Sequence, residues 1–188
     1  MLYFWKKDRS ISPILSMKKK LAVTLFALTI TVILMVSGCQ RDDICAESDP
    51  KTPGLIIKFQ DFNSPETDKT VSNLRVLAEG IETPLPGLSG SSTDSITVPL
   101  QSFSPRTTFI FISDYQIDSE GNETGNSDIL RFDYITREVF ISRACGFVAN
   151  YETLTSSLTL DSENWIQSVI INTDNVNDET QTHVTILH

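Results

Sequence analysis

Three cysteines are the side chains of this chain best suited to covalent chemistry, and Cys39 stands in the most specific setting. It ends the sequence Val36-Ser37-Gly38-Cys39, which follows 16 uncharged, mostly apolar residues at 21–36 and the three lysines of 18–20. A basic start, a short apolar core, small residues and then a cysteine are typical of a lipobox. We therefore expect cleavage between Gly38 and Cys39 and acylation of Cys39, with palmitate among the acyl chains.

The apolar core of this leader is short for a membrane span. A bilayer needs roughly 20 apolar residues, whereas a secretory core has about 7 to 15. An uncleaved N-terminal anchor is the alternative. Met17 directly precedes the lysines, so we expect translation to start there. The predicted organisation is an extension at 1–16 that precedes the true start, a lipoprotein signal peptide at 17–38, an acidic tether at 39–53 and a β domain at 54–188.

Cys45 and Cys145 are the other two thiols, and a chain that has left the cytoplasm meets oxidising conditions. We expect them to form a disulfide, with two separate buried thiols as the alternative. A nucleophilic role would need a nearby base, and no histidine lies near either cysteine in sequence.

The charge of the chain excludes one class of partner. The full sequence has a net charge of −9, and removal of residues 1–38 leaves nine basic and 23 acidic residues, a net charge of −14. Nucleic-acid binders need clustered lysine and arginine, so nucleic acid is excluded as a partner. The same charge repels anionic headgroups, so membrane attachment should depend on the acyl chains.

Groups for catalysis are few. The only histidines are His183, in an alternating segment, and His188, the last residue, where we expect poor order. A hydrolase triad would have to use His183, but no Gly-x-Ser-x-Gly motif accompanies it. One usable imidazole leaves too few ligands for zinc. We assign no catalytic residue, no metal and no cofactor, and expect a structural role for His183.

Carboxylates are abundant, and a polar segment at 113–127 gathers several of them. A calcium or other ligand site there would use Asp114, Asp118, Glu120 and Asp128. Their spacing does not match the twelve-residue calcium loop, and a solvated hairpin tip is the alternative. A pair of carboxylates for glycoside hydrolysis depends on geometry that the sequence does not supply.

Aromatic residues offer a further binding surface. A platform for sugar would use Phe103, Tyr115, Tyr134, Tyr151 and Trp165, although such residues in β proteins more often pack in the core, and we expect Trp165 to be buried. The proline- and glycine-containing loop at 84–95 could shape a partner-binding end of the domain.

The elements that must position these residues are strands, because apolar residues recur with a period of two. No segment after the leader has helical spacing over three turns. Loops are expected at 63–70, 81–95 and 113–127, and strands at 55–62, 71–78, 96–100, 107–112, 129–135, 139–143, 147–151, 165–171 and 183–187. This pattern predicts an all-β fold, a two-sheet antiparallel β-sandwich of the immunoglobulin or transthyretin kind, with a small barrel as the alternative.

Four segments carry a resemblance to a known family. They are Asp42–Cys45, Thr52–Ile57, Asp94–Leu100 and Arg143–Phe147. Together they resemble an uncharacterised Gram-negative lipoprotein family, known only as a domain of unknown function, over nearly all of the chain after the signal. The resemblance implies an anchored single domain with paired cysteines and no assigned activity.

A second resemblance concerns the destination of the chain. Gln40-Arg41-Asp42-Asp43 is similar to acidic signals that export some lipoproteins to the cell exterior, and Gln40 differs from the aspartate that marks inner-membrane retention. We expect an outer-membrane lipoprotein, periplasmic or surface-exposed. Its domain would be a non-catalytic binding or assembly module for an envelope protein or glycan. An envelope carbohydrate hydrolase with paired carboxylates and a purely structural envelope protein are the alternatives.

Overall fold

The structure, a computed structural model, describes residues 13–36 and 44–188, and within its helix it describes the side chains of residues 20–31. The predicted cleavage and lipidation residues, Gly38 and Cys39, lie outside the described residues, as do residues 1–12 of the predicted extension. The chain divides into two units, Met1–Ile44 and Cys45–His188, and each is described by itself.

The first unit contains the helix α1 (Pro13–Val36), which starts before Met17. Proline suits the first helical position because its missing N–H has no partner there in any case. The hydroxyls of Thr24 and Thr29 donate hydrogen bonds to the backbone carbonyls of Leu21 and Phe26, at 2.9 and 2.8 Å, so these polar groups are satisfied within the helix. Within the described residues, no helix combines the length and the hydropathy needed to cross a membrane.

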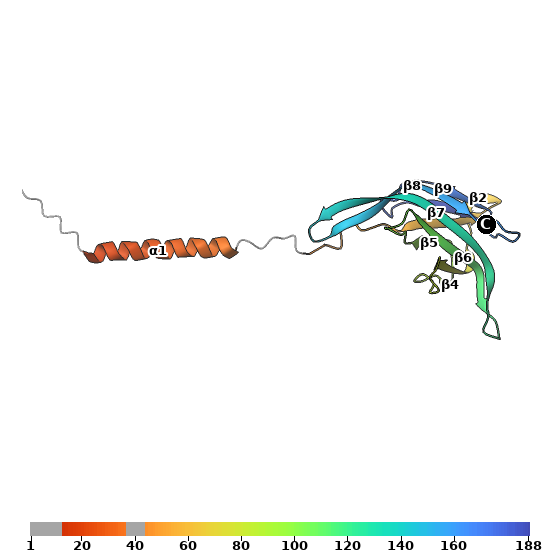
Figure 1. The fold of residues 1–188 in the computed structure, drawn as a ribbon, viewed down its shortest axis with the longest axis horizontal. Coiled ribbons are helices and arrows are strands. Elements are labelled where there is room, and N and C mark those ends of the chain that lie inside the picture. The colour runs from red at the N-terminus through yellow and green to blue at the C-terminus, as the bar shows by residue number, and fades with distance from the viewer. Residues whose placement is uncertain (1–12, 37–43) are drawn as a thin grey trace, which may run out of the picture. The chain divides into compact units, whose positions relative to one another are not determined.

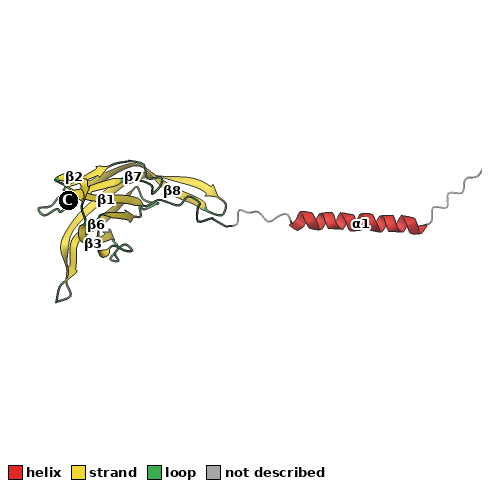
Figure 2. Ribbon diagram, turned by 180° about the vertical axis from the view of Figure 1, so that it is seen from behind, coloured by secondary structure: helices red, strands yellow, loops and turns green. Residues whose placement is uncertain are grey.

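The second unit consists of ten strands in two sheets (Figures 1 and 2). One sheet has the order β2-β1-β10-β9, with β5 also paired to β1, and the other has the order β4-β3-β6-β7-β8. The strands are β1 (Leu55–Asp61), β2 (Ser64–Asp68), β3 (Val71–Ala78), β4 (Ser89–Thr93), β5 (Ser95–Val98), β6 (Arg106–Ile117), β7 (Glu123–Ser142), β8 (Gly146–Leu158), β9 (Ser168–Ile171) and β10 (Val184–Leu187).

The prediction of a wholly antiparallel fold is wrong in one place. The first and last strands, β1 and β10, pair in parallel, with Ile57 opposite Val184 and Gln60 opposite Leu187. Every other strand pair is antiparallel. Hydropathy along a strand shows which face is buried but not which strand lies beside it, so this long-range pairing left no local signal.

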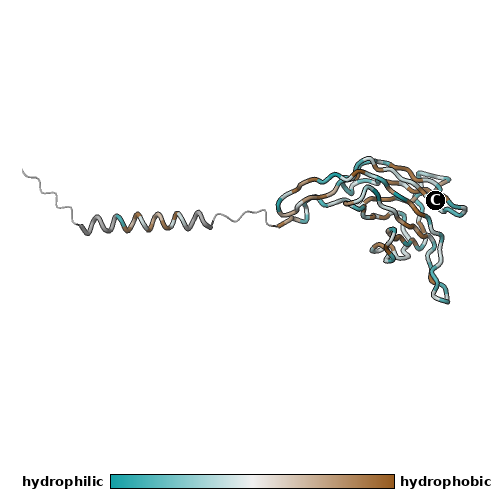
Figure 3. The backbone as a smooth tube through the Cα atoms, viewed as in Figure 1, coloured by the Kyte–Doolittle hydropathy of each residue, from teal (hydrophilic) through white to brown (hydrophobic). Residues whose placement is uncertain are grey.

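The two sheets bury one common core. Alternate residues of β1, namely Leu55, Ile57 and Phe59, are fully buried in the same cluster as Phe109 and Phe111 of β6. The opposite side chains of these strands are more exposed, which is the period of two expected for a sheet with one buried face. In Figure 3 the β6–β7 turn is coloured largely teal, which marks hydrophilic residues, in contrast to the apolar residues of the core.

The loop predicted at 113–127 is mostly strand. β6 and β7 continue pairing as far as Ile117 and Glu123, and only residues 118–122 form the turn. A register shift between Ser113 and Gln116 interrupts the ladder, and Asp114 has a φ of 50° there. Polar composition suggested a loop, but the backbone hydrogen bonds of a hairpin do not require apolar side chains on both faces.

Strand β7 is longer than predicted. It joins the expected strands at 129–135 and 139–143 into one 20-residue element that pairs with β6 and then with β8 (Figure 1). A register shift between Asp133 and Ile135 lets it bend without ending. Two further short strands, β2 and β4, lie in segments predicted as loops, and all five residues of β2 are exposed, so they lack the apolar alternation.

The outer edge of β8 is covered by other segments. Tyr151 and Val176 exchange two backbone hydrogen bonds of 3.1 and 2.8 Å, and Leu154 N–H donates to the Asp174 carbonyl at 2.9 Å. Further along, Ala149 N–H donates to the hydroxyl of Thr52 at 2.9 Å. Other segments of the same domain therefore cover much of the outer edge of this long strand, which would otherwise be open to pairing.

Two glycines of the β6–β7 hairpin give a matched test of this geometry. Gly125 has a φ of 140°, and a Cβ there would lie 2.8 Å from the Ser113 carbonyl oxygen. Gly121 has a φ of 88°, but a Cβ there would meet nothing within 4 Å. We expect Gly121→Ala to cost about 1 kcal/mol from backbone strain. Gly125→Ala should cost more than about 2 kcal/mol because a steric clash is added.

Chemical denaturation of both variants and the parent protein measures the difference. Equal losses would contradict the close approach of the two strands at Ser113.

Candidate functional site

The disulfide between Cys45 and Cys145 ties the start of the second unit to the turn of the β7–β8 hairpin. Cys145 lies in the turn between β7 and β8, and the two Cα atoms are 4.8 Å apart. The predicted pairing is therefore present in the structure. The bridge closes a loop with a sequence separation of 100, for which chain entropy predicts a stabilisation of about 4.7 kcal/mol.

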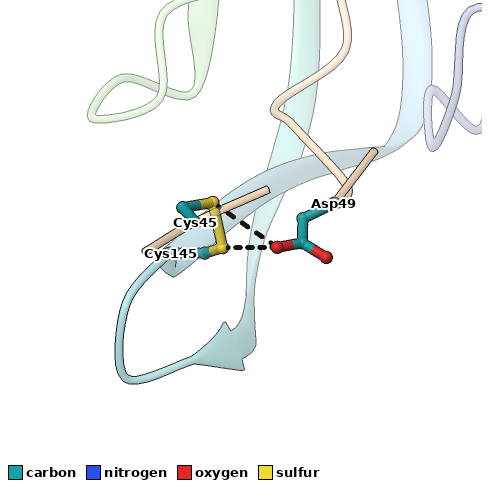
Figure 4. A group of neighbouring side chains, drawn as sticks. All are labelled: Cys45, Asp49 and Cys145. Atoms are coloured by element: carbon teal, nitrogen blue, oxygen red, sulfur yellow. Dashed lines mark hydrogen bonds between the residues drawn. A yellow bond between two sulfur atoms is a disulfide. The ribbon is translucent and has the colours of Figure 1, made fainter. Parts of the chain in front are cut away.

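Asp49 lies against this disulfide (Figure 4). One carboxylate oxygen is 3.1 Å from the sulfur of Cys145 and 3.8 Å from that of Cys45, and it accepts the Ala46 N–H at 2.9 Å. Because both sulfurs are bonded to each other, neither has a proton to donate, so these are close contacts rather than hydrogen bonds.

Cys45, Asp49 and Cys145 form the one group of three metal-ligand residue types that converge within the described residues. Metal binding by cysteine requires the thiolate, which the disulfide removes. The arrangement is therefore a structural bridge with a carboxylate closing the adjacent turn.

Further hydrogen bonds hold the chain where the predicted tether meets the β domain. Thr52 accepts the Ala149 N–H of β8, and Gly54 N–H donates to the carboxylate of Glu179 at 2.6 Å. A side chain at position 54 would clash with the methyl group of Thr97, so glycine is needed for this approach. The segment predicted as a tether at 39–53 is thus packed onto the domain in its second half.

Carboxylates do gather near the tether. Asp49, Asp178 and Glu179 line a hollow of about 530 Å³ together with Ser48, Pro50, Lys51, Thr52, Pro53 and Asn177. Each carboxylate already accepts a hydrogen bond, and the bonds from Thr180 lower the pKa of Asp178 below its usual value. The general acid of a glycosidase needs a raised pKa, so Asp178 is poorly suited to that role.

His183 links the first and last strands of the β domain. It is fully buried. Its ring Nδ1 accepts the Ile56 backbone N–H at 3.0 Å, and its backbone N–H donates to the Ile56 carbonyl at 3.1 Å. Burial lowers its pKa, against the opposing effects of the Asp178 backbone and the Asp178 and Glu179 carboxylates. Nε2 has no hydrogen-bond partner. This environment favours the neutral ring and a structural role between β1 and β10.

The prediction of a poorly ordered C-terminus is wrong. His188 N–H donates to the Gln60 carbonyl at 3.0 Å, and its imidazole packs edge-on against Phe59 and Trp165, with centroids 6.1 and 5.6 Å away. Burial lowers the pKa of His188 as well. The last residue is therefore anchored beside the core.

The four carboxylates proposed as a loop site do not converge. Asp118 accepts the N–H groups of Glu120 and Asn122 at 2.8 and 2.9 Å, which closes the tight β6–β7 turn and lowers the pKa of Asp118. Asp128 is buried in β7, where it accepts the Ile166 N–H at 2.7 Å and the side-chain amide of Asn164 at 2.9 Å. These residues shape loops in this structure.

The aromatic residues proposed as a platform do not form one exposed surface. Tyr134 and Tyr151 are buried with ring centroids 5.0 Å apart, and their hydroxyls donate to the carbonyls of Gln101 and Leu100. Trp165 is partly buried against the core. Tyr115 packs elsewhere, under the guanidinium of Arg75, and Phe103 is 97% exposed. The loop at 84–95 folds back onto β3 through Leu88, which is largely buried.

Two features of the hairpins were not predicted from the sequence. Arg75 of β3 forms a 2.9 Å ion pair with Glu123, which adjoins the β6–β7 turn, and Tyr115 contacts both side chains. At the other hairpin, Phe140 and Phe147 face each other with 57% and 65% of their surfaces exposed. The signal for the second feature was present, because apolar residues flank the turn on both sides.

Comparison with known proteins assigns a family without an activity. Residues 73–188 match a family model described as a family of unknown function (DUF6452). The match covers Cys145 but not Cys45, so it extends over less of the chain than the sequence resemblance suggested. No curated protein and no solved structure matches significantly.

Removal of the bridge should weaken the domain without abolishing its fold. The double variant Cys45→Ser/Cys145→Ser leaves the common core intact, and we expect the free energy of unfolding to fall by about 2 to 5 kcal/mol. Urea denaturation measures the loss, and parent protein treated with reductant is the matched control. Equal stability of the parent with and without reductant would contradict a stabilising bridge.

The stability of the domain should also depend on pH through its histidines. Because the pKa of His183 is lowered below 6.5, the unfolded chain takes up a proton first as the pH falls through that value. The free energy of unfolding should therefore be greatest above about pH 6.5 and decrease as the pH falls toward 5. His188 contributes in the same direction.

Thermal unfolding of the parent, His183→Gln and His188→Gln proteins across this range measures the effect. We expect a shallower slope in each variant, since glutamine keeps an acceptor but does not titrate. An unchanged slope in His183→Gln would show that this ring is not kept neutral by the fold.

Proposed function

Because the chain belongs to the DUF6452 family, which has no assigned function, we propose a function from its own residues: an outer-membrane lipoprotein whose β domain is a non-catalytic binding or assembly module. Cys39 is the acylated residue and the new N-terminus. The acyl chains hold the protein at the membrane, and the acidic domain remains in the aqueous phase of the envelope.

The observation that carries this proposal is the position of the disulfide next to the lipobox. Cys45 is six residues after Cys39, and it is covalently joined to Cys145 of the β domain. A disulfide fits an oxidising compartment outside the cytoplasm, to which a lipoprotein signal would deliver the chain. The bridge also transmits any pull on the anchor directly to the domain.

The surface of the domain supports a role in binding or assembly. Phe103 and Ile135, which are 97% and 59% exposed, line a hollow of about 330 Å³ together with Pro105, Tyr134 and the hydroxyl-bearing residues Ser102, Ser104 and Thr136. Exposed apolar groups around a hollow are suited to accept an apolar side chain of a partner. We propose an envelope protein as that partner.

Acylation of Cys39 is tested by the mass and location of the protein expressed from its full gene in a Gram-negative host. We expect a mature chain that starts at Cys39, carries a diacylglyceryl group and an N-terminal acyl chain, and fractionates with the outer membrane. Cys39→Ser should remain at precursor size because the signal cannot be removed. Cys45→Ser is the control and should still be processed.

Processing of Cys39→Ser to the same mature mass as the parent would contradict the lipobox. An acylated protein found in the inner membrane would contradict only the outer-membrane destination.

A further inference from the structure

The tip of the β7–β8 hairpin presents an exposed aromatic pair. Phe140 and Phe147 stand directly opposite each other in the ladder, close to the end of the hairpin, and their ring centroids are 5.2 Å apart. Contact between the rings still leaves 57% and 65% of the two residues exposed. Figure 1 shows this hairpin extending beyond the other strands of the β domain, so the pair has little of the domain around it.

The charge at this tip differs from that of the domain. Residues 139–149 contain a single charged residue, the exposed Arg143 in the turn, whereas the chain after residue 38 has a net charge of −14. On the bridged segment, Glu47 is exposed, whereas Asp49 turns its carboxylate toward the Ala46 N–H and the disulfide. Two aromatic rings with one arginine form an amphipathic tip of the kind that suits a lipid–water interface.

The covalent path from this tip to Cys39 is short. Cys145 is two residues from Phe147 and is bonded to Cys45, which is six residues after Cys39. Six residues span at most about 20 Å and two residues about 7 Å. If Cys39 carries acyl chains, the aromatic pair is therefore held within about 30 Å of the membrane surface.

We propose that Phe140 and Phe147 insert into the headgroup region of the membrane that holds the acylated Cys39, so that the β domain contacts the bilayer at a second point. This inference rests on the lipid anchor of the proposed function. The rings cover their exposed apolar surface in the lipid, and Arg143 pairs with phosphate groups at the same depth. The disulfide keeps the hairpin tip close to the anchor.

The test uses single tryptophans placed at the tip and away from it. Phe140→Trp and Phe147→Trp place the fluorophore at the tip, and Leu160→Trp places it at an 81% exposed site past the opposite end of β8. Each processed full-length protein is reconstituted into vesicles of phosphatidylethanolamine and phosphatidylglycerol. These vesicles contain phosphatidylcholine brominated near the top of its acyl chains. The parent protein, which keeps Trp165, supplies the background.

We expect the added emission of Phe140→Trp and Phe147→Trp to shift to shorter wavelength and to lose intensity with brominated lipid. Leu160→Trp and the parent should show neither change. Acylated protein that floats with the vesicles while the tip tryptophans remain unquenched would overturn the inference and leave the anchor intact. Quenching of Leu160→Trp to the same extent would also overturn it, since the contact would not be specific to the tip.

Three further outcomes distinguish the lipid contact from a protein contact and from the anchor itself. Tip tryptophans that are shielded in native outer membranes but not in pure lipid vesicles would assign the pair to a protein partner and overturn the lipid contact. Protein that lacks acyl chains and does not float would overturn both the proposed function and the inference. Protein that lacks acyl chains but floats with quenched tip tryptophans would overturn the anchor and support the lipid contact.

Discussion

The burial of one apolar core between two sheets is the constraint on which the rest of the structure depends. Strands from both sheets, such as β1 and β6, contribute alternate side chains to the same cluster. A shift of one residue in any of these strands would move its apolar side chains to the solvent face, so the core fixes the register of each strand. Fixed register in β7 then places the hairpin turn, and with it Cys145, at a defined distance from the core.

How much of the fold could be predicted depends on how local its causes are. The strands around Leu55, Val71 and Phe109 were predictable, because their apolar alternation is a local pattern. The parallel pairing of β1 with β10 was not, since it joins residues more than 120 positions apart and neither strand encodes its neighbour. The extension of β6 and β7 into a polar hairpin was missed for a related reason: backbone pairing continued where side-chain burial had ended.

The candidate site shows the same division. The disulfide followed from counting thiols in a chain expected to leave the cytoplasm, and the structural role of His183 followed from the absence of partner residues in sequence. The roles of the loop carboxylates could not be assigned from composition. Asp118 and Asp128 belong to the same acidic stretch, yet one caps an exposed turn and the other is buried under Ile166. Only three-dimensional placement distinguishes these two uses of the same side chain.

The covered edge of β8 has a consequence for proteins crowded in two dimensions. Molecules attached to one membrane meet far more often than the same molecules in solution, and a free strand edge would let neighbours join sheet to sheet. Here the backbone groups of Ala149, Tyr151 and Leu154 are already bonded to Thr52, Val176 and Asp174. If the proposed anchor holds the protein at a membrane, neighbouring copies cannot pair with β8 at these three positions, and contacts there must use side chains, which can select a specific partner.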